Sequence, residues 1–137
     1  HAGRMAAIDL RSGVGVWELD LASVQSPWVA GDFIFVVTLN AEVIALSRED
    51  GRVHWVQQLS RFENERLRED PIQWSGPVLA GDRLILGSST GEVVSLSPYD
   101  GRVLGTLRFK DGISIAPMVA DGTLYVLTDR AVLHAYR

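Results

Sequence analysis

Short runs of alternating apolar and polar residues recur along the chain, separated by residues that favour turns. The alternation is clear in Phe33, Phe35 and Val37. A period of two residues predicts strands with one face turned toward a core. Helical periodicity is absent, apart from a weak case within residues 60–71. The pattern therefore predicts an all-β fold, with strands near residues 5–10, 14–20, 27–31, 33–39, 42–47, 53–59, 76–80, 83–89, 92–97, 103–109, 116–120, 123–128 and 131–136.

A repeat in two halves organises these strands. The first half reads Pro, three residues, Gly-Asp and an apolar run, and it occupies residues 27–36, 77–86 and, with Gly and Asp exchanged, 117–126. The second half reads a small residue, a turn containing Gly and often a Trp four residues after that Gly. Its copies begin at Ala7, Ala45 and Ser95, with a truncated copy at Ala135.

The copies are spaced by about 40 residues. Ala7 to Ala45 is 38 residues, Ala45 to Ser95 is 50, and Ser95 to Ala135 is 40. A period near 40 with four strands per unit is typical of β-propeller blades. The longer middle interval indicates an insertion of about ten residues. We therefore expect a fragment of a β-propeller with about three four-stranded antiparallel blades.

The spacing divides the chain into parts of one incomplete propeller. The expected parts are the end of one blade (1–21), a full blade (25–59), an insertion loop (60–73), a second full blade (74–109) and an incomplete final blade (114–137).

Two tryptophans, Trp17 and Trp55, occupy the same place in the repeat, at the start of the outermost strand. An indole ring buries a large apolar area, and its N–H needs a hydrogen-bond partner. We expect each ring to cover the apolar face of the next blade. The alternative is that these rings stack on a ligand.

Composition narrows the class of protein. The chain has 137 residues, of which 47% are hydrophobic and 22% charged, so it can bury a core. A net charge of −4 argues against a nucleic-acid binder, which needs a basic surface. The absence of Cys excludes disulfides, thiolate metal sites and cysteine nucleophiles. No apolar run reaches the roughly 18 residues that span a membrane.

The sequence predicts no catalytic residue, no metal ligand and no cofactor site. Histidines stand singly, and no Gly-x-Ser-x-Gly, phosphate-binding or calcium-binding motif occurs. Five aspartates lie beside a glycine in a predicted turn, and their turn role explains them without metal binding: Asp32, Asp50, Asp82, Asp100 and Asp121.

The insertion is the one segment that departs from the repeat. Residues 60–71 contain three Arg, four acidic residues, Phe62 and Leu67. Two interpretations stay open: a solvated charged loop or short capping helix, and a loop that contacts a partner. For the second, the candidate residues are Arg61, Phe62, Arg66, Arg68 and Trp74, with Trp74 placed to hold the base of the loop.

The second half of the repeat resembles that of the PQQ-like β-propeller family, in which Ala-Leu-Asp, a Ser-Gly or Thr-Gly turn and a Trp recur. Residues 7–17 carry this pattern most fully, whereas Ser47 stands in place of its Asp and Gly105 in place of its Trp. Within that family the chain resembles the C-terminal third of the BamB family, the lipoproteins of outer-membrane β-barrel assembly. Residues 77–101 and 117–137 carry much of this resemblance.

The resemblance implies a non-enzymatic, protein-binding scaffold on the periplasmic side of the outer membrane of a Gram-negative bacterium. It implies a partner, the periplasmic domains of the outer-membrane barrel-assembly protein, and membrane attachment only through a lipid anchor outside this chain. It implies no cofactor. The family's own contact loops lie largely upstream of the matching portion, so no contact residue is transferred to this chain.

Two other functions are weighed against the scaffold. The alternative is a fragment of a PQQ-dependent quinoprotein dehydrogenase, which would bind PQQ and calcium. A WD40-type module is disfavoured because its Gly-His and Trp-Asp signatures are absent. If the chain does start and stop within blades, its end blades expose unpaired edges, so we expect the fragment to self-associate.

Overall fold

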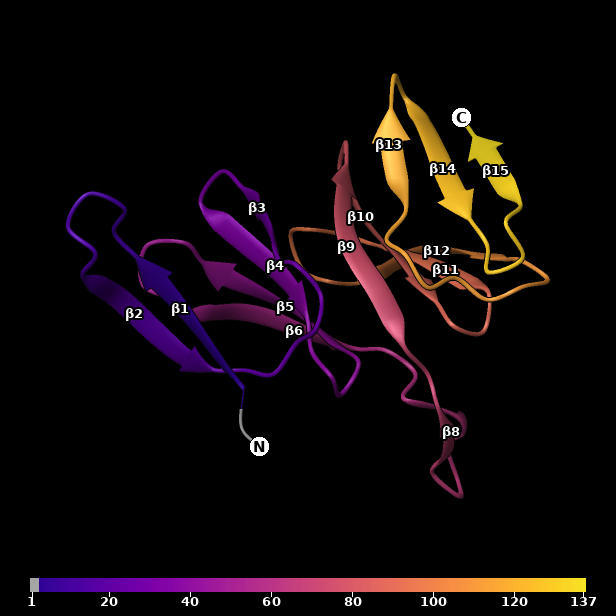
Figure 1. Ribbon diagram of the computed structural model, residues 1–137, viewed down its shortest axis with the longest axis horizontal. Helices are drawn as coiled ribbons and strands as arrows, with labels where there is room; N and C mark the ends of the chain where they lie inside the picture. Colours follow the sequence, from indigo (N-terminus) through magenta and orange to yellow (C-terminus); the bar gives the residue numbers. More distant parts are fainter. Residues whose placement is uncertain (1–2) are drawn as a thin grey trace.

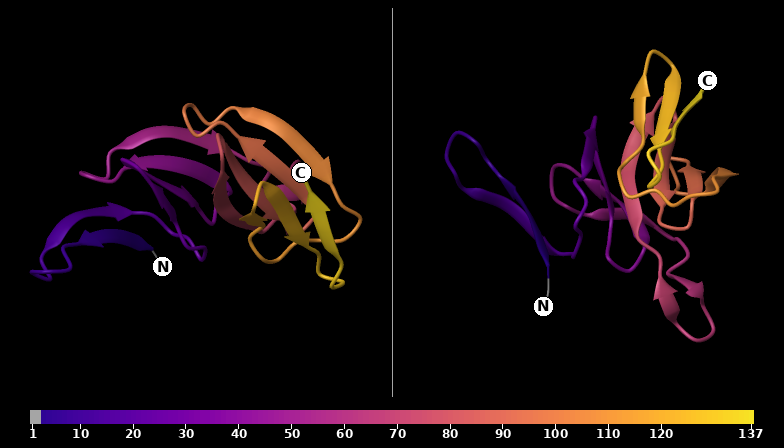
Figure 2. Two further views of the ribbon diagram at one scale, coloured as in Figure 1. Left: turned by 90° about the horizontal axis from the view of Figure 1, so that it is seen from above. Right: turned by 45° about the vertical axis from the view of Figure 1, so that its right-hand side comes forward.

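All regular elements of the computed structural model, which describes residues 3–137, are β-strands (Figure 1). Four sheets follow one another along an arc, and a separate two-stranded hairpin projects from it (Figures 1 and 2). The described residues form no helix long and apolar enough to cross a membrane. The prediction of an all-β propeller fragment is confirmed.

Within each sheet, strands that are consecutive in the chain pair antiparallel. In chain order the strands are β1 (Arg4–Ile8), β2 (Gly15–Asp20), β3 (Trp28–Ala30), β4 (Phe33–Val37), β5 (Glu42–Ser47), β6 (Val53–Gln58), β7 (Phe62–Asn64), β8 (Glu69–Pro71), β9 (Trp74–Ala80), β10 (Arg83–Ser88), β11 (Glu92–Leu96), β12 (Val103–Arg108), β13 (Met118–Ala120), β14 (Thr123–Leu127) and β15 (Leu133–Tyr136). The two four-stranded sheets have the orders β3-β4-β5-β6 and β9-β10-β11-β12. They are flanked by the two-stranded sheet β1-β2 and the three-stranded sheet β13-β14-β15.

The thirteen strands expected from the alternating pattern all occur, with small shifts at their ends. Strands β7 and β8 were not expected. They lie within the insertion, where the sequence allowed a loop or a short helix, and they form a hairpin instead.

Strand β4 shows how one sheet serves two cores. Ile34 and Val36 pack in one cluster with residues of the β1-β2 sheet. Phe35 and Val37 pack in another cluster with residues of the β9-β12 sheet. Successive side chains of a strand point to opposite faces, so the alternation buries both faces of the sheet against its neighbours.

The first seam between sheets is closed by Trp17 of β2. Its Nε1–H donates a hydrogen bond to the carbonyl oxygen of Arg48, at 2.9 Å, in the turn between β5 and β6. The ring lies directly over Gly51 of that turn, where a Cβ would stand only 2.6 Å from Trp17 Cε3. Glycine is therefore required there, both for the ring and for its φ of 74°.

Trp55 of β6 closes the second seam in the same way. Its Nε1–H donates to the carbonyl oxygen of Pro98, at 2.9 Å, in the turn between β11 and β12. The ring lies over Gly101, where a Cβ would stand 2.5 Å from Trp55 Cε3. Each indole thus packs on the turn of the next sheet and satisfies its own polar group there. We assign Trp17 and Trp55 to docking between sheets.

Aspartates hold these turns in shape. The carboxylate of Asp50 accepts a hydrogen bond from the backbone N–H of Arg52, at 3.0 Å, and Asp100 does the same for Arg102. This backbone hydrogen bond is the main cause that lowers the pKa of Asp50. The pKa of Asp9 in the first sheet is lowered likewise by the backbone N–H groups of Ser12 and Arg11.

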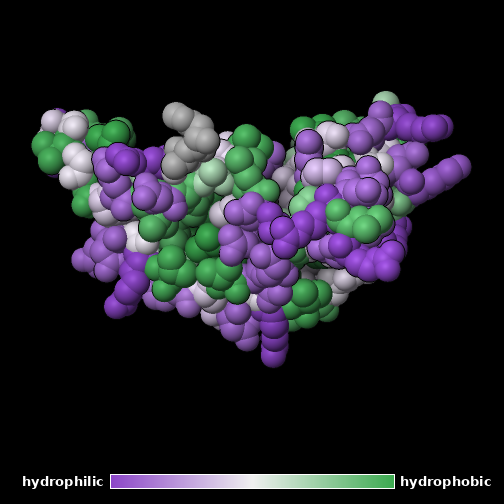
Figure 3. Space-filling view, turned by 90° about the horizontal axis from the view of Figure 1, so that it is seen from below, coloured by the Kyte–Doolittle hydropathy of each residue, from purple (hydrophilic) through white to green (hydrophobic). Residues whose placement is uncertain are grey.

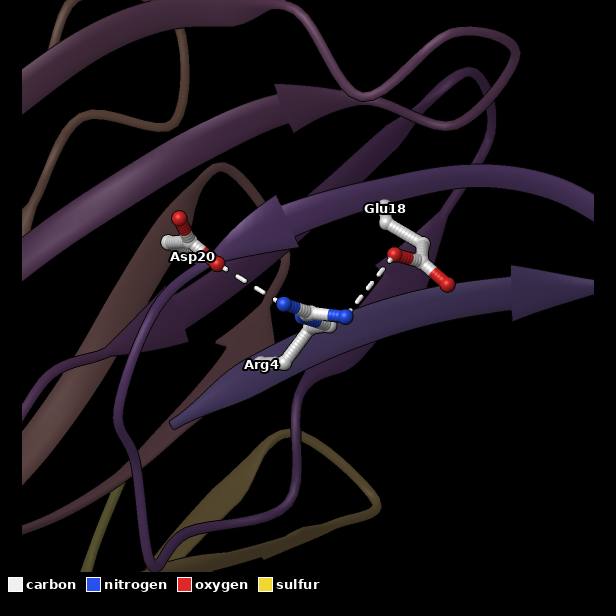
Figure 4. Close-up of polar contacts among 3 residues, drawn as sticks. All are labelled: Arg4, Glu18 and Asp20. Carbon is white, nitrogen blue, oxygen red and sulfur yellow. Dashed lines mark hydrogen bonds and ion pairs between the residues drawn. The ribbon is translucent and has the colours of Figure 1, made fainter. Parts of the chain in front are cut away.

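The first sheet also carries a small network of charges. Arg4 of β1 lies 3.3 Å from Glu18 and 3.6 Å from Asp20, both on β2 (Figure 4). All three side chains are largely exposed, so water and salt screen the attraction. These ion pairs orient the two strands but contribute little to stability.

Apolar side chains are exposed on the sheets at the two ends of the arc. Hydrophobic residues are visible at the end formed by β1 and β2 (Figure 3), where Leu10 is fully exposed. At the other end, Met118 and Leu133 are more than half exposed. Self-association through these surfaces stays a prediction.

The docking of Trp55 on Gly101 predicts a difference between two glycine substitutions. Gly31 also has a positive φ, of 57°, but a Cβ there meets nothing within 4 Å. Gly31→Ala should therefore cost only backbone strain, about 1–2 kcal/mol of unfolding free energy. Gly101→Ala should cost about 1–3 kcal/mol more, because the new Cβ overlaps the indole. Urea denaturation followed by circular dichroism measures both, and equal losses would contradict this account of the seam.

Candidate partner-binding site

The insertion forms the hairpin of β7 and β8, which projects away from the sheets where the chain passes from β6 to β9 (Figures 1 and 2). Its register pairs Phe62 with Pro71 and Asn64 with Glu69. The backbone N–H of Ile72 donates to the carbonyl oxygen of Arg61, at 2.8 Å, and closes its base.

Side chains within the hairpin fix its local shape. One carboxylate oxygen of Glu65 accepts hydrogen bonds from the backbone N–H groups of Arg61, at 2.8 Å, and Phe62, at 3.2 Å. The side-chain oxygen of Asn64 accepts one from the backbone N–H of Leu67, at 3.2 Å. These side-chain hydrogen bonds add to the few backbone hydrogen bonds that two strands of three residues each can form.

Two residues of the hairpin have strained backbones. Arg68 has a φ of 55° and Asp70 a φ of 57°. Residues other than glycine rarely adopt the left-handed region, and such strain is concentrated at functional sites. Ala41, Asp121 and Ala131 have similar φ values in turns of the sheets, so the values at Arg68 and Asp70 mark tight turning of the hairpin backbone.

Arg61 and Phe62 form the base of the hairpin. The Arg61 guanidinium carbon lies 5.4 Å from the centre of the Phe62 ring, within the range of a cation–π contact. Its Nη2 also donates to the side-chain oxygen of Asn40, at 3.2 Å, which connects the hairpin to the sheet of β3 to β6. Arg61 therefore holds the hairpin in place while its side chain stays exposed.

The tip of the hairpin carries Arg66, Leu67 and Arg68. All three are exposed, and Leu67 has an exposed fraction of 53%. Within residues 3–137, neither arginine makes an ion pair or a side-chain hydrogen bond. The tip thus presents two unpaired guanidinium groups around one apolar side chain.

Trp74 does not belong to the contact surface. It is only 7% exposed and packs in the core cluster with Phe35, Leu84 and Leu86. Its Nε1–H donates to the carbonyl oxygen of Ser60, at 2.9 Å, at the start of the hairpin. The structure contradicts the prediction of Trp74 as a partner contact, because only 7% of the residue is exposed. Its expected role at the base of the insertion agrees with the contact to Ser60.

A recess of about 370 Å³ lies beside the base of the hairpin. Its walls come from the ends of β4, β8 and β9, from the segments that join β4 to β5 and β8 to β9, and from the loops before β3 and β13, and they include Leu39, Ile72 and Gln73. The exposed hairpin therefore lies next to a concave part of the surface.

The histidines and tyrosine described next lie outside the hairpin, and each makes a packing contact or a hydrogen bond within the sheets. The ring of His54 packs edge-on against Phe33 with centroids 4.9 Å apart, and that of His134 lies 4.7 Å from the ring of Phe109. The hydroxyl of Tyr99 donates to Asp82, at 3.1 Å, and the negative carboxylate raises the pKa of Tyr99. Among residues 3–137, no three His, Asp or Glu side chains gather as metal ligands.

Sequence reasoning missed three residues of this site. Asn40 lies 21 residues before its partner Arg61, so no local pattern connects them. Glu65 gave no signal beyond its charge. Leu67 was noted as apolar but left out of the candidates, although an apolar residue between two arginines is itself a signal for a contact point.

These observations define the class of protein. Consecutive four-stranded antiparallel sheets, joined by a tryptophan that packs on a glycine turn of the next sheet, make this chain a section of a β-propeller built from PQQ-like repeats.

Comparison with known proteins then gives the family. The family described as "Outer membrane protein assembly factor BamB" matches residues 1–57 and 57–137, so the chain belongs to it. The chain is 35% identical over 78 residues to the protein of that name from Salmonella typhimurium. This alignment covers 57% of the present chain and 19% of the Salmonella protein. The chain is 33% identical over 57 residues to the one from Marinobacter adhaerens, covering 42% and 15%.

The fold is also that of a solved relative. The crystal structure of BamB from Moraxella catarrhalis superimposes with a TM-score of 0.75 at 23% identity, over 98% of this chain and 40% of that chain. The present chain therefore spans well under half the length of the relatives it matches.

The contacts of Glu65 predict a local effect of its removal. Glu65→Ala should expose the backbone N–H groups of Arg61 and Phe62, at a cost of about 1 kcal/mol, and speed their hydrogen exchange roughly fivefold. Glu63, which is exposed in the same hairpin, gives the control Glu63→Ala. Amide exchange followed by NMR measures the effect. The explanation fails if the two variants exchange alike, or if Glu65→Ala lowers the melting temperature of the sheets.

Proposed function

We propose that this chain contributes to outer membrane protein assembly as a non-enzymatic scaffold. Its membership of the BamB family supports this role, since the matched relatives are outer membrane protein assembly factors by name. The scaffold acts at the periplasmic face of the outer membrane of a Gram-negative bacterium. Its link to the membrane is a lipid anchor outside the residues present here.

The observation that carries the proposal is the β7-β8 hairpin. A scaffold binds through loops that a rigid framework holds in position. Here the framework is the pair of complete sheets, and Trp74 connects their core to the start of the hairpin at Ser60. The tip can therefore meet a partner without first losing much conformational entropy.

The chemistry of the tip indicates what it contacts. Arg66 and Arg68 present planar donors that match carboxylates in a bidentate geometry, and arginine is enriched where binding energy concentrates. Leu67 between them adds an apolar contact. We propose that the tip binds an acidic surface with an apolar pocket, on the periplasmic domains of the outer-membrane barrel-assembly protein.

The alternative function, a PQQ-dependent quinoprotein dehydrogenase, receives no specific support from the site. Titration of the chain with PQQ and calcium, followed by absorbance, is a direct test of it. Saturable binding together with dye-linked alcohol oxidation would replace the scaffold proposal.

The proposed contact predicts the effect of removing the two tip arginines. Binding of the intact chain to the purified periplasmic domains is measured by biolayer interferometry. The double variant Arg66→Ala, Arg68→Ala should bind about tenfold more weakly, and its residual binding should depend less on salt.

A matched control removes two arginines elsewhere. Arg52 and Arg102 are exposed in the turns before β6 and β12, so Arg52→Ala, Arg102→Ala changes the net charge equally while leaving the hairpin intact. Equal weakening by both double variants would assign the effect to overall charge. Unchanged affinity of the tip variant would remove the hairpin from the interface, and no binding of the unaltered chain would refute the proposed partner.

A further inference from the structure

A pocket of about 260 Å³ lies at the surface of the second seam, between the two complete sheets. All the residues that line it fall between Ala30 and Tyr99, within these sheets and their turns. The pocket lies where β9 ends, whereas the β7-β8 hairpin lies where β9 begins (Figure 1). The two surfaces are therefore at opposite ends of the strands.

Half of the residues that line the pocket have aromatic or imidazole rings. Phe33, Phe35, His54 and Trp55 come from the sheet of β3 to β6, and Tyr99 comes from the turn between β11 and β12. The ring of His54 packs edge-on against Phe33, and the ring of Phe35 lies 6.1 Å from that of Trp55. The face of an aromatic ring carries partial negative charge, so such a wall attracts cations.

A shift in strand register brings His54 to this wall. Two consecutive residues of β5 pair with Trp55 and Val53, so His54 between them is an extra residue in β6. A bulge of this kind changes the direction of a side chain. The β1-β2 and β11-β12 pairs have the same shift, but their extra residues are Val16 and Leu104. The imidazole ring is therefore particular to the second seam.

The negative charge of the pocket comes from Asp82, in the turn between β9 and β10. It is the one carboxylate among the lining residues, which include no Lys or Arg. Its Oδ1 accepts a hydrogen bond from the Tyr99 hydroxyl, at 3.1 Å, and within residues 3–137 it makes no ion pair. This bond holds the Tyr99 ring beside the carboxylate, and the residue is 78% exposed, so a ligand can reach both.

We propose that this pocket binds an arginine side chain of another protein. The guanidinium group lies against the aromatic rings and donates a hydrogen bond to the carboxylate of Asp82, which balances its charge. Arginine is favoured over lysine because its planar, weakly hydrated group can stack on a ring and bind a carboxylate together. The volume is below the range of about 300–1,000 Å³ that holds a drug-sized ligand, so it suits one side chain.

This pocket shares no residue with the β7-β8 hairpin, so the proposal does not depend on the function proposed above.

Titration of the intact chain with the tripeptide acetyl-Ser-Arg-Ser-amide, followed by NMR, tests the proposal. The indole N–H signal of Trp55 and the backbone amide signals of Asp82 and Tyr99 report on the pocket. We expect these signals to shift saturably, with a Kd in the millimolar range. Replacing the peptide arginine by citrulline, which keeps the shape and removes the charge, should weaken binding about tenfold. The lysine peptide should bind more weakly than the arginine peptide.

Substitutions in the chain separate the charge from the ring. Asp82→Asn keeps the shape and should weaken binding about tenfold. Its matched control is Asp32→Asn, since Asp32 follows Gly31 as Asp82 follows Gly81 but does not line the pocket, and binding should persist. Tyr99→Phe keeps the ring and should retain binding, whereas Tyr99→Leu should weaken it about fivefold.

Four results would overturn the proposal. They are no saturable shift up to about 50 mM peptide, equal affinity of the arginine and citrulline peptides, equal effects of Asp82→Asn and Asp32→Asn, and equal affinity of the two Tyr99 variants. Thermal melting verifies that the variants unfold cooperatively, and the comparison of peptides needs no variant at all. Analytical ultracentrifugation adds a fifth result. A dimer of the unaltered chain that Asp82→Asn dissociates would assign the pocket to a second copy instead.

Discussion

A tryptophan that lies on a glycine turn of the neighbouring sheet is the contact on which the arc depends. The contact joins residues 31 positions apart for Trp17 and 43 apart for Trp55, so it unites repeats that share no strand. It combines burial of a large ring with a hydrogen bond for the indole N–H, and it needs a residue without a Cβ underneath. The repeat preserves all three conditions in the seams closed by Trp17 and Trp55, whereas in the sheet of β9 to β12 the same row of residues ends in Gly105.

The hairpin depends on the same framework in a different way. Its strands are too short to be stable alone, and it takes its position from the buried Trp74 and from the contact of Arg61 with Asn40. The sheets thus form a rigid framework, whereas the hairpin presents the exposed side chains of Arg66, Leu67 and Arg68. This division of labour fits a protein that acts by presenting surfaces, and it accounts for the isolation of the unpaired arginines on the one segment that breaks the repeat.

Much of this architecture could be predicted from the sequence, because strand alternation and turn chemistry are local signals. The docking role of Trp17 and Trp55 was predictable from their place in the repeat, but their acceptors at Arg48 and Pro98 depend on how sheets stack. The hairpin was missed because residues 60–71 are mostly charged or polar and show no apolar alternation, and because Glu65 shapes the turn through its side chain. Trp74 was misassigned as a contact because its position after a charged loop hides that it begins a buried strand.

The sharing of strand β4 between two cores has a consequence for how the molecule comes apart. The sheet of β3 to β6 contributes to one apolar cluster with β1-β2 and to another with the sheet of β9 to β12. Opening of either seam therefore uncovers one face of this sheet while its other face stays packed. The two seams are thus separable units of local unfolding that share a single strand, β4.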